Sequence, residues 1–407
     1  MKCRHCASEL VHTFLDLGYS PLSNAYLSEG DLLKPEKYYP LKVKVCANCW
    51  LVQTEDYAQA DELFSADYAY FSSTSTIWLE HAKIYVEKMI QKFSLNGNSR
   101  VIEVASNDGY LLKNFISAGI DCLGIEPTAS TAEVCEQLGI PVLREFFGEK
   151  LGKHIASEGK QADLIVGNNV YAHVPDINDF TRGLKAALKP EGVITLEFPH
   201  LLELIQHTQF DTVYQEHFSY LSLYTVDKIF KTADLRVWDV EKLPTHGGSL
   251  RVYGCHEISG HQTQEAVAKL LAEETYSEMQ NLATYLNFQP RANKIKDDLL
   301  SFLIEQKRSG KKIAAYGAAA KGNTLLNYAG IKPDLIPFVC DAAKSKQGKY
   351  MPGSHIPILP PCELSKAKLD YVLILPWNIA TEVCQQNAGL KSKGIRFLTA
   401  IPELTVI

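Results

Sequence analysis

Three side chains able to carry acid–base chemistry lie close together in the sequence at Tyr214, Glu216 and His217. A histidine accepts protons near neutral pH, and a tyrosine hydroxyl can donate a hydrogen bond to a developing oxyanion. In an extended segment Tyr214 and Glu216 would share one face, whereas in a helix Tyr214 and His217 would be neighbours. Both arrangements stay open, as does the alternative that the cluster only caps a loop.

Four of the ten cysteines form two Cys-x-x-Cys pairs near the N-terminus, Cys3 with Cys6 and Cys46 with Cys49. Two such pairs supply the tetrahedral set of thiolates that zinc prefers, and four sulfur ligands leave no position open for water. We therefore expect one structural Zn²⁺. Redox chemistry of a Cys-x-x-Cys pair is the alternative. The other six cysteines show no paired spacing, and we expect most of them to be small buried residues.

The composition is that of an ordinary globular protein, with 407 residues, 46% of them hydrophobic and 22% charged. At roughly 100 to 200 residues per domain, this length allows two to four domains. The net charge of −6 and the absence of a long basic run argue against a general nucleic-acid binder. No apolar run approaches the ~18 residues that span a bilayer, and the first residues lack a signal-peptide core, so we expect a cytoplasmic protein with no membrane partner.

Strands and helices alternate through the centre of the chain. These elements must position the side chains of the Tyr214–His217 cluster. An amphipathic helix is expected at 79–93, and five short apolar runs predict strands at 101–105, 122–125, 140–143, 164–166 and 193–198. Such alternation implies right-handed crossovers and a parallel, doubly wound α/β sheet that binds ligands at the C-terminal ends of its strands.

Two further regions flank this centre. Near the N-terminus, residues 41–45 alternate between apolar and lysine residues like a half-exposed strand. A charged helical connector follows the centre at 264–306, with a break at 287–290. Strands are then expected at 312–316, 336–340 and 371–375, which predict a second, smaller α/β domain.

Small and acidic residues follow the first two central strands, where a cofactor would bind. Glu103 lies in the first strand, and Glu126 ends the second, a position from which carboxylates commonly accept hydrogen bonds from ribose hydroxyls. Small residues in the turn after the first strand let the backbone approach a ligand closely. The residues that form this turn are Ala105, Ser106, Asn107 and Gly109. After the third and fourth strands, Phe146 and Phe147 are candidates to wall an adenine, and Asn168 and Asn169 to form the loop beside the cofactor.

Taken together, these stretches resemble the sugar-nucleotide C-methyltransferases that add branched methyl groups to deoxysugars. The resemblance covers nearly the whole chain and includes the cysteine pairs and residues 68–73, 103–109, 168–173, 214–217, 246–251 and 317–323. It implies a zinc-binding N-terminal domain at 1–70, a Rossmann-like S-adenosylmethionine (SAM) methyltransferase domain at 71–260 and a second Rossmann-like α/β domain at 261–407 that holds the sugar nucleotide. Ala105 and Asn107 stand where glycines are frequent in SAM methyltransferases, which keeps nicotinamide binding open as an alternative.

The resemblance also implies a reaction. The usual substrate is a nucleoside-diphosphate 4-keto-6-deoxysugar, methylated at C3. A carbon next to a ketone can lose a proton to form an enolate, and this carbon then takes the methyl group from the sulfonium of SAM without a catalytic metal. By resemblance His217 is the general base, Tyr214 and Glu216 contact the sugar or enolate, and His173 is a second candidate base that we rank as substrate-binding.

Other roles follow from the same resemblance. One of Tyr68 and Tyr70 is expected to face the active site. In the C-terminal domain, the glycine-rich turn that ends in Lys321 and Asn323 opens a helix whose free N–H groups favour phosphate. The turn lacks the full P-loop pattern, so nucleotide hydrolysis is not supported. Trp377 and Asn378 are candidates to contact the nucleoside.

We therefore expect a monomeric SAM-dependent enzyme whose partner is a dTDP- or GDP-linked sugar. Two functions of other classes stay open. An NAD-dependent sugar-nucleotide oxidoreductase would also use two Rossmann-like units. A non-catalytic zinc-containing binding module would keep the fold without the chemistry.

Overall fold

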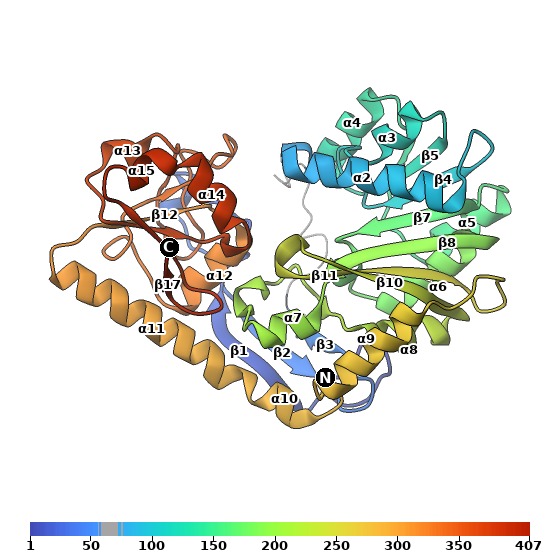
Figure 1. The fold of residues 1–407 in the computed structure, drawn as a ribbon, viewed down its shortest axis with the longest axis horizontal. Helices are drawn as coiled ribbons and strands as arrows, with labels where there is room; N and C mark the ends of the chain where they lie inside the picture. Colours follow the sequence, from blue (N-terminus) through green and yellow to red (C-terminus); the bar gives the residue numbers. More distant parts are fainter. Residues whose placement is uncertain (56, 58–71, 75) are drawn as a thin grey trace.

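The computed structural model describes residues 1–55, 57, 72–74 and 76–407. Tyr68 and Tyr70, two predicted site residues, lie outside these described residues. Three β-sheets of four, seven and six strands organise the described part of the chain (Figure 1). Within that part, no helix combines the length and the apolar character needed to cross a lipid bilayer.

The four-stranded sheet is antiparallel and lies beside the two cysteine pairs. Its strands in spatial order are β1 (His12–Ser20), β2 (Tyr39–Val45), β3 (Val52–Thr54) and β9 (Ser219–Tyr220), and the short helix η1 (Asp31–Leu33) lies between β1 and β2 in the chain. Alternate residues of β2 are buried, which confirms the half-exposed strand expected at 41–45. The fourth strand comes from far along the chain, directly after Phe218, and so ties the N-terminal segment to the Tyr214–His217 region.

The central sheet has seven strands. In spatial order they are β10 (Leu235–Leu243), β11 (Ser249–His256), β8 (Leu188–Pro199), β7 (Ala162–Asn168), β4 (Arg100–Val104), β5 (Asp121–Ile125) and β6 (Val142–Leu143). The five strands from β8 to β6 are parallel, as the alternating pattern predicts. The other two, β11 and β10, form an antiparallel hairpin at one edge, which the pattern did not indicate.

Helices cover both faces of this sheet. They are α2 (Thr76–Phe93), α3 (Leu112–Ser117), α4 (Ala129–Gln137), α5 (Glu149–Ser157), α6 (Ile177–Ala187) and α8 (Leu223–Thr232). The same part of the chain contains α7 (Leu201–Gln206) and the short helices η2 (Ser72–Thr74), η3 (Tyr171–His173), η4 (Phe210–Thr212) and η5 (Thr245–Gly247), of which α7 and η4 pack in a separate core with β1. Successive residues of β4 join different cores, Val101 on one face and Ile102 on the other, and both are fully buried. A sheet buried on both faces explains why its strands read as continuous apolar runs.

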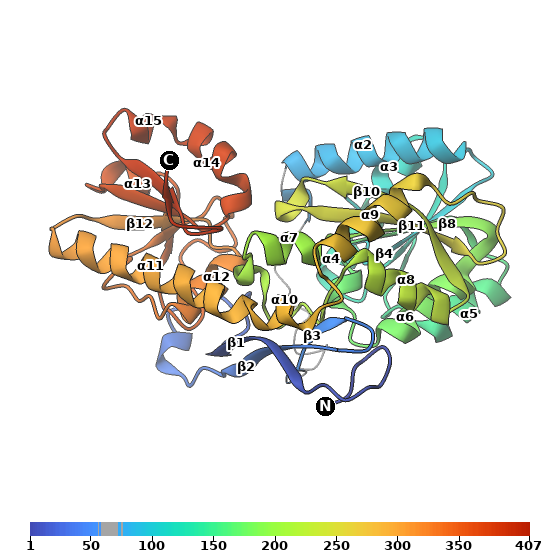
Figure 2. The same cartoon turned by 60° about the horizontal axis from the view of Figure 1, so that its bottom comes forward.

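A helical arm leads to the third sheet. It consists of α9 (Glu265–Tyr276), α10 (Leu282–Leu286) and α11 (Phe288–Arg308). The break expected at 287–290 is confined to Asn287, because Pro290 lies in the first turn of α11, where its missing N–H costs no helical hydrogen bond. Figure 2 shows α11 running from α10, which packs on β1, along the side of the C-terminal sheet.

The C-terminal sheet is parallel except at one edge. Its order is β14 (Ile358–Leu359), β13 (Val339–Cys340), β12 (Ile313–Tyr316), β15 (Tyr371–Ile374), β16 (Arg396–Thr399) and β17 (Thr405–Val406), of which β17 alone is antiparallel to its neighbour. Its helices are α12 (Ala320–Tyr328), α13 (Glu363–Lys366), η6 (Trp377–Ile379), α14 (Ala380–Gln386) and α15 (Ala388–Lys391). The predicted α/β fold, with a small N-terminal unit beside two Rossmann-like sheets, is confirmed.

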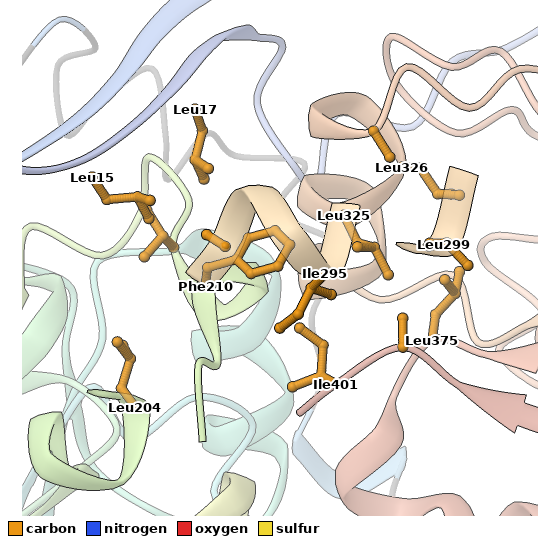
Figure 3. Packing of buried hydrophobic residues seen from close by; sticks show 14 of the residues in the cluster. Leu15, Leu17, Leu204, Phe210, Ile295, Leu299, Leu325, Leu326, Leu375 and Ile401 are labelled. Atoms are coloured by element: carbon orange, nitrogen blue, oxygen red, sulfur yellow. The ribbon is translucent and has the colours of Figure 1, made fainter. Parts of the chain in front are cut away.

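One hydrophobic core joins the parts of the chain (Figure 3). Its members include Leu15 and Leu17 from β1, Phe210 from η4, Ile295 and Leu299 from α11, and Leu325 from α12. Burial of aliphatic and aromatic side chains contributes about 1.5 to 3 kcal/mol each, so this shared core fixes the four-stranded and six-stranded sheets relative to each other and to the segment that follows β8. The cavity described below depends on that relative placement.

Candidate active site

The four paired cysteines converge on one point. Their sulfur atoms all lie within 4.8 Å of one another, and Sγ of Cys3 is 3.5 Å from that of Cys49, as is Sγ of Cys6 from that of Cys46. A tetrahedral zinc with bonds of about 2.3 Å places its sulfurs about 3.8 Å apart, so the set fits Zn²⁺. The predicted structural zinc site is confirmed in ligand identity and geometry.

Both cysteine pairs adopt the same turn. The N–H of Ala7 donates to the carbonyl of Cys3 at 3.0 Å, and that of Trp50 donates to the carbonyl of Cys46 at 2.9 Å. Ala7 and Trp50 each have a positive φ, 59° and 65°. The Nε2 of Gln53 donates to the sulfur of Cys3 at 3.2 Å, which stabilises a thiolate ligand.

A cavity of about 610 Å³ opens at the C-terminal ends of the parallel central strands. Its wall is completed by the Tyr214–His217 segment and by the start of α12 from the C-terminal sheet. Twelve of the predicted site residues line it, namely Ala105, Asn107, Glu126, Phe146, Phe147, Asn168, Asn169, His173, Tyr214, Glu216, His217 and Lys321. Residues predicted from separate motifs therefore share one cavity.

Six other predicted residues do not line the cavity, namely Glu103, Ser106, Gly109, Asn323, Trp377 and Asn378. Asn323 lies one turn into α12, is fully buried and donates to the Ser23 carbonyl at 3.4 Å. Trp377 and Asn378 lie behind Lys321 rather than in the wall. Side-chain direction decides these cases, and spacing alone does not predict it.

The turn after β4, which the sequence predicts to bind the cofactor, contains several residues with positive φ. Ala105, Asn107 and Gly109 all have positive φ, at 58°, 49° and 76°. Glycine reaches this conformation without strain, which explains why it is frequent at such positions, and here an alanine and an asparagine adopt it instead. Glycine is required at Gly124 of β5, where an added Cβ would lie 2.6 Å from the hydroxyl of Ser106.

Glu126 ties this turn to the end of β5. Its two carboxylate oxygens accept from the N–H of Asn107 and from the N–H of Thr128, both at 2.9 Å. The residue is buried and also lines the cavity. Glu126 therefore shapes the end of the cavity next to the turn after β4.

Several buried polar atoms near this end have no hydrogen-bond partner within the described part of the chain. They are Glu103 Oε2, Ser106 Oγ, Asp108 Oδ1 and both amide atoms of Asn168. Burial, with the Asp108 and Glu126 carboxylates nearby, raises the pKa of Glu103 well above its ordinary value. A ligand with an ammonium group, hydroxyls and a heterocycle supplies partners of the kind these atoms lack, and SAM carries all three.

A turn settles the arrangement of the Tyr214–His217 segment. The N–H of His217 donates to the Tyr214 carbonyl at 3.0 Å, and the two rings lie 4.0 Å apart. His173, at the end of η3, packs edge-on against His217 with ring centroids 4.6 Å apart. Asn24, from the N-terminal segment, donates to the Glu216 carboxylate at 2.6 Å.

Both histidines are neutral at physiological pH. Nδ1 of His217 donates to the Thr212 carbonyl at 2.9 Å, which leaves the lone pair on Nε2. Burial, and then the neighbouring His173, lower the pKa of His217 well below its ordinary value. Burial also lowers the pKa of His173 to about 4. His217 is therefore in the form that accepts a proton.

Two lysines, Lys321 and Lys346, line the cavity near the start of α12. Nζ of Lys321 donates to the Asn378 side chain at 2.7 Å and lies 4.7 Å from the Trp377 ring centre. Trp377 in turn donates to the Asp211 carboxylate at 2.8 Å. Burial lowers the pKa of Lys321, an effect that Asp211 opposes. Lys346 also lines the cavity and donates to the Ala318 carbonyl at 2.8 Å.

Several cavity residues were missed by the sequence patterns. One is Trp78, in the first turn of α2, which stacks on His81 at 4.8 Å and lies 5.4 Å from His246, a wall residue from the 246–251 stretch of the resemblance. Asn24 and Lys346 are the others that matter for charge and hydrogen bonding. No local signal points to them, because each reaches the cavity through the packing of distant segments.

The whole chain is similar in sequence to a known methyltransferase. The chain is 34% identical to the C-methyltransferase NovU of Streptomyces niveus, over 406 residues that cover 100% of this chain and 96% of the relative. The chain belongs to the C-methyltransferase family. Three family models match successive segments of this C-methyltransferase. They are described as "Putative zinc binding domain" at residues 3–64, "Methyltransferase domain" at 78–240 and "C-methyltransferase C-terminal domain" at 244–402.

Solved structures show weaker, partial similarity to this C-methyltransferase. The magnesium protoporphyrin IX methyltransferase of Synechocystis PCC 6803 with bound SAH is 12% identical, with a TM-score of 0.35, over 45% of this chain and 88% of that chain. A SAM-dependent methyltransferase of Archaeoglobus fulgidus is 17% identical, with a TM-score of 0.33, over 40% of this chain and 71% of that chain.

The sequence-based identification of the family is thus confirmed, and of the functions left open, methyl transfer is supported. The chain is a SAM-dependent C-methyltransferase with a four-cysteine zinc site. SAM supplies an electrophilic methyl group when bound.

Proposed function

We propose that this C-methyltransferase methylates C3 of a nucleoside-diphosphate 4-keto-6-deoxysugar through an enolate. The observation that carries the proposal is His217, a buried neutral base at the cavity wall whose Nδ1 is committed to the Thr212 carbonyl. Removal of a proton from the carbon next to a ketone needs such a base. The proposed reaction requires no catalytic metal. The nucleotide stays open between dTDP and GDP.

In the proposed reaction Nε2 of His217 takes the C3 proton, and the electron pair left behind forms the enolate. Bound SAM would supply the electrophilic methyl group that this carbon takes up, and the cavity residues assigned to SAM would hold it in line with C3. Tyr214 and Glu216 contact the sugar or enolate, and the Asn24 amide orients Glu216. His173, in ring contact with His217, binds the substrate and is the second candidate base.

The cofactor end of the cavity is assigned to the central sheet. The turn at 105–109, Glu126, Asn168 and Asn169 hold SAM in this proposal, with Phe146 and Phe147 beside its adenine. Phe147 is also packed edge-on against Phe180 at 5.2 Å, so this wall is rigid. Glu103 does not line the cavity and contributes to the cofactor site as a buried carboxyl group in β4.

The diphosphate end is assigned to the start of α12. Lys321 and Lys346 both line the cavity there, beside Ala319 and Ala320 at the helix N-terminus. Two lysines and a helix N-terminus favour an anion, and burial of both ammonium groups strengthens their attraction for a charged ligand. Trp377 and Asn378 serve this site by fixing Lys321 rather than by contacting the nucleoside directly.

The division into domains at 1–70, 71–260 and 261–407 is part of this proposal. It is supported by the strands, because β1 to β3, β4 to β11 and β12 to β17 fall in successive parts. The cavity takes residues from each part, with Asn24 from the first and Lys321 from the third. The substrate would then be enclosed between a cofactor-binding unit and a nucleotide-binding unit.

The decisive experiment is incubation with SAM and a small panel of dTDP- and GDP-linked 4-ketosugars, followed by mass spectrometry for the gain of one methyl group. A second measurement isolates the base: exchange of the C3 proton with deuterated water, followed by NMR without a methyl donor. Methylation of none of the panel, or methylation at a carbon that bears no exchangeable proton, would contradict the proposal.

A further inference from the structure

Arg4 lies inside the first cysteine pair, yet its side chain contacts three segments outside the metal site. Nη1 donates to the Pro175 carbonyl at 2.8 Å, and Nη2 donates to the Thr54 carbonyl at 3.1 Å. The guanidinium carbon lies 5.4 Å from the centre of the Phe218 ring. One side chain thus bridges the zinc knuckle and two separate parts of the central unit.

Two of the contacted residues lie within two positions of a cavity histidine in the sequence. Pro175 follows closely after His173, and Phe218 comes immediately after His217. Thr54 strengthens the second link, because its N–H donates to the Phe218 carbonyl at 3.1 Å and its hydroxyl donates to the His217 carbonyl at 3.4 Å. The segments that Arg4 joins are therefore those that carry the two rings in contact.

The backbone from which the Arg4 side chain extends is held by its own hydrogen bonds. Gln53 bonds both to the Cys3 sulfur and to the N–H of Arg4, the latter at 2.9 Å. The Asn178 amide donates to the carbonyl of His5 at 2.8 Å, and its oxygen pairs with the His5 ring at 2.8 Å. With zinc holding Cys3 and Cys6, the backbone at Arg4 has little freedom.

We infer that Arg4 is a positioning residue that holds the His173 and His217 segments in register and connects the zinc site to the cavity. A guanidinium presents its donors in a rigid planar fork, so it fixes both carbonyls it binds at a set distance. Catalytic groups act only when held close to the productive geometry by such supporting contacts. The inference rests on the roles proposed above for the two histidines.

The test compares Arg4→Gln with Arg4→Lys and with Lys2→Gln, each as full-length zinc-loaded protein. Lys2→Gln is the matched control, because it removes a positive charge from an exposed side chain in the same segment. The main readout is the cross-relaxation between the His173 and His217 rings in protein labelled at histidine Cε1. Zinc content, SAM affinity, kcat and KM are measured on the same samples.

For Arg4→Gln we expect unchanged zinc content and SAM affinity, loss of the ring-to-ring signal and a fall in kcat of about ten- to hundredfold. Arg4→Lys is expected to recover part of both, and Lys2→Gln to resemble the parent protein. A retained ring signal with parental kcat in Arg4→Gln would overturn the inference. If no ketosugar is methylated by the parent protein, the proposed function fails, while the ring signal still tests the role of Arg4.

If Arg4→Gln loses zinc, Asn178→Ala decides instead, since it frees the knuckle from α6 without touching a sulfur ligand. A weakened ring signal and a lowered kcat in Asn178→Ala, at full zinc content, support the inference. Parental values of both in that variant contradict it.

Discussion

A single hydrogen bond determines which nitrogen of His217 can act. Because Nδ1 donates to the Thr212 carbonyl, the neutral ring carries its lone pair on Nε2, and burial keeps that ring neutral by lowering its pKa. A depressed pKa makes His217 a weak base in the free enzyme. In the proposed reaction, the enolate that forms beside the ring would oppose this effect, because a buried anion near the ring stabilises its protonated form.

His217→Ala is expected to lower kcat by about 10² to 10⁴, since general-base catalysis contributes that much. SAM affinity should stay within about twofold, because the cofactor wall is formed by other strands. Turnover assays and calorimetric SAM titration measure the two effects. A near-normal rate in this variant would move the role of base to His173, and His173→Ala would then show the larger loss.

Acid sensitivity follows from the histidines of the cavity wall. Burial lowers the pKa of His173 and of His246 to about 4, against an ordinary value of 6.5. The unfolded chain therefore binds more protons between about pH 6.5 and 4, so stability is intact above this window and falls as the pH drops through it. The loss is at most about 1.4 kcal/mol per pH unit for each histidine.

His246→Asn should weaken this pH dependence. Urea unfolding of the parent protein and the variant, from about pH 7.5 down to 5, gives the free energy of unfolding of each. The gap between the two curves is expected to narrow as the pH falls. Curves that stay parallel throughout would show that His246 does not take up a proton on unfolding.

At the scale of elements, the cofactor end depends on two loops that one carboxylate joins. Glu126 connects the turn after β4 with the start of α4 through two backbone N–H groups. Hydrogen bonds to a charged group contribute about 1.5 to 3 kcal/mol each. Their loss would free the turn that has positive φ at Ala105 and Asn107.

We therefore expect Glu126→Ala to raise the Kd for SAM by about ten- to hundredfold while leaving the fold intact. Calorimetry measures the affinity, and circular dichroism checks the fold. Glu133→Ala is the matched control, because Glu133 lies on α4 with an exposed side chain. Unchanged SAM affinity in Glu126→Ala would remove Glu126 from the cofactor site.

Local elements are the part of the structure that the sequence predicts well. The cysteine pairs and the five central strands depend on neighbouring residues, and each is where its pattern indicates. The turn at 214–217 was left open, because nothing local chooses between an extended and a helical segment. It is decided by contacts with distant residues such as Thr54 and Asn24.

The same distinction explains the site. Polar residues at strand ends could be predicted, since the ends of parallel strands meet at one edge. Trp78 and Lys346 could not, because they enter the cavity from a helix outside the predicted motifs and from a separate sheet. The placement of Trp377 outside the cavity wall likewise depends on its hydrogen bond to Asp211, which is distant in the sequence.

At the scale of the whole molecule, the zinc site stabilises the contacts between the N-terminal segment and the central unit as well as its own turns. We expect one zinc per chain by elemental analysis, lost in Cys46→Ser and kept in Cys362→Ser, whose cysteine is exposed and unpaired with the cluster. Loss of a structural zinc is expected to lower Tm by more than about 5 °C. Persistent absence of metal from freshly purified protein would instead favour the redox alternative.

The pairing of β3 with β9 also constrains the order in which the chain assembles. The four cysteines are synthesised early, but the strand that completes their sheet is supplied only after most of the central unit has been made. Until then β3 presents an open edge to other chains. A fragment that ends before Ser219 would keep all its zinc ligands and still carry that edge, so the N-terminal unit is expected to be prone to self-association when produced alone.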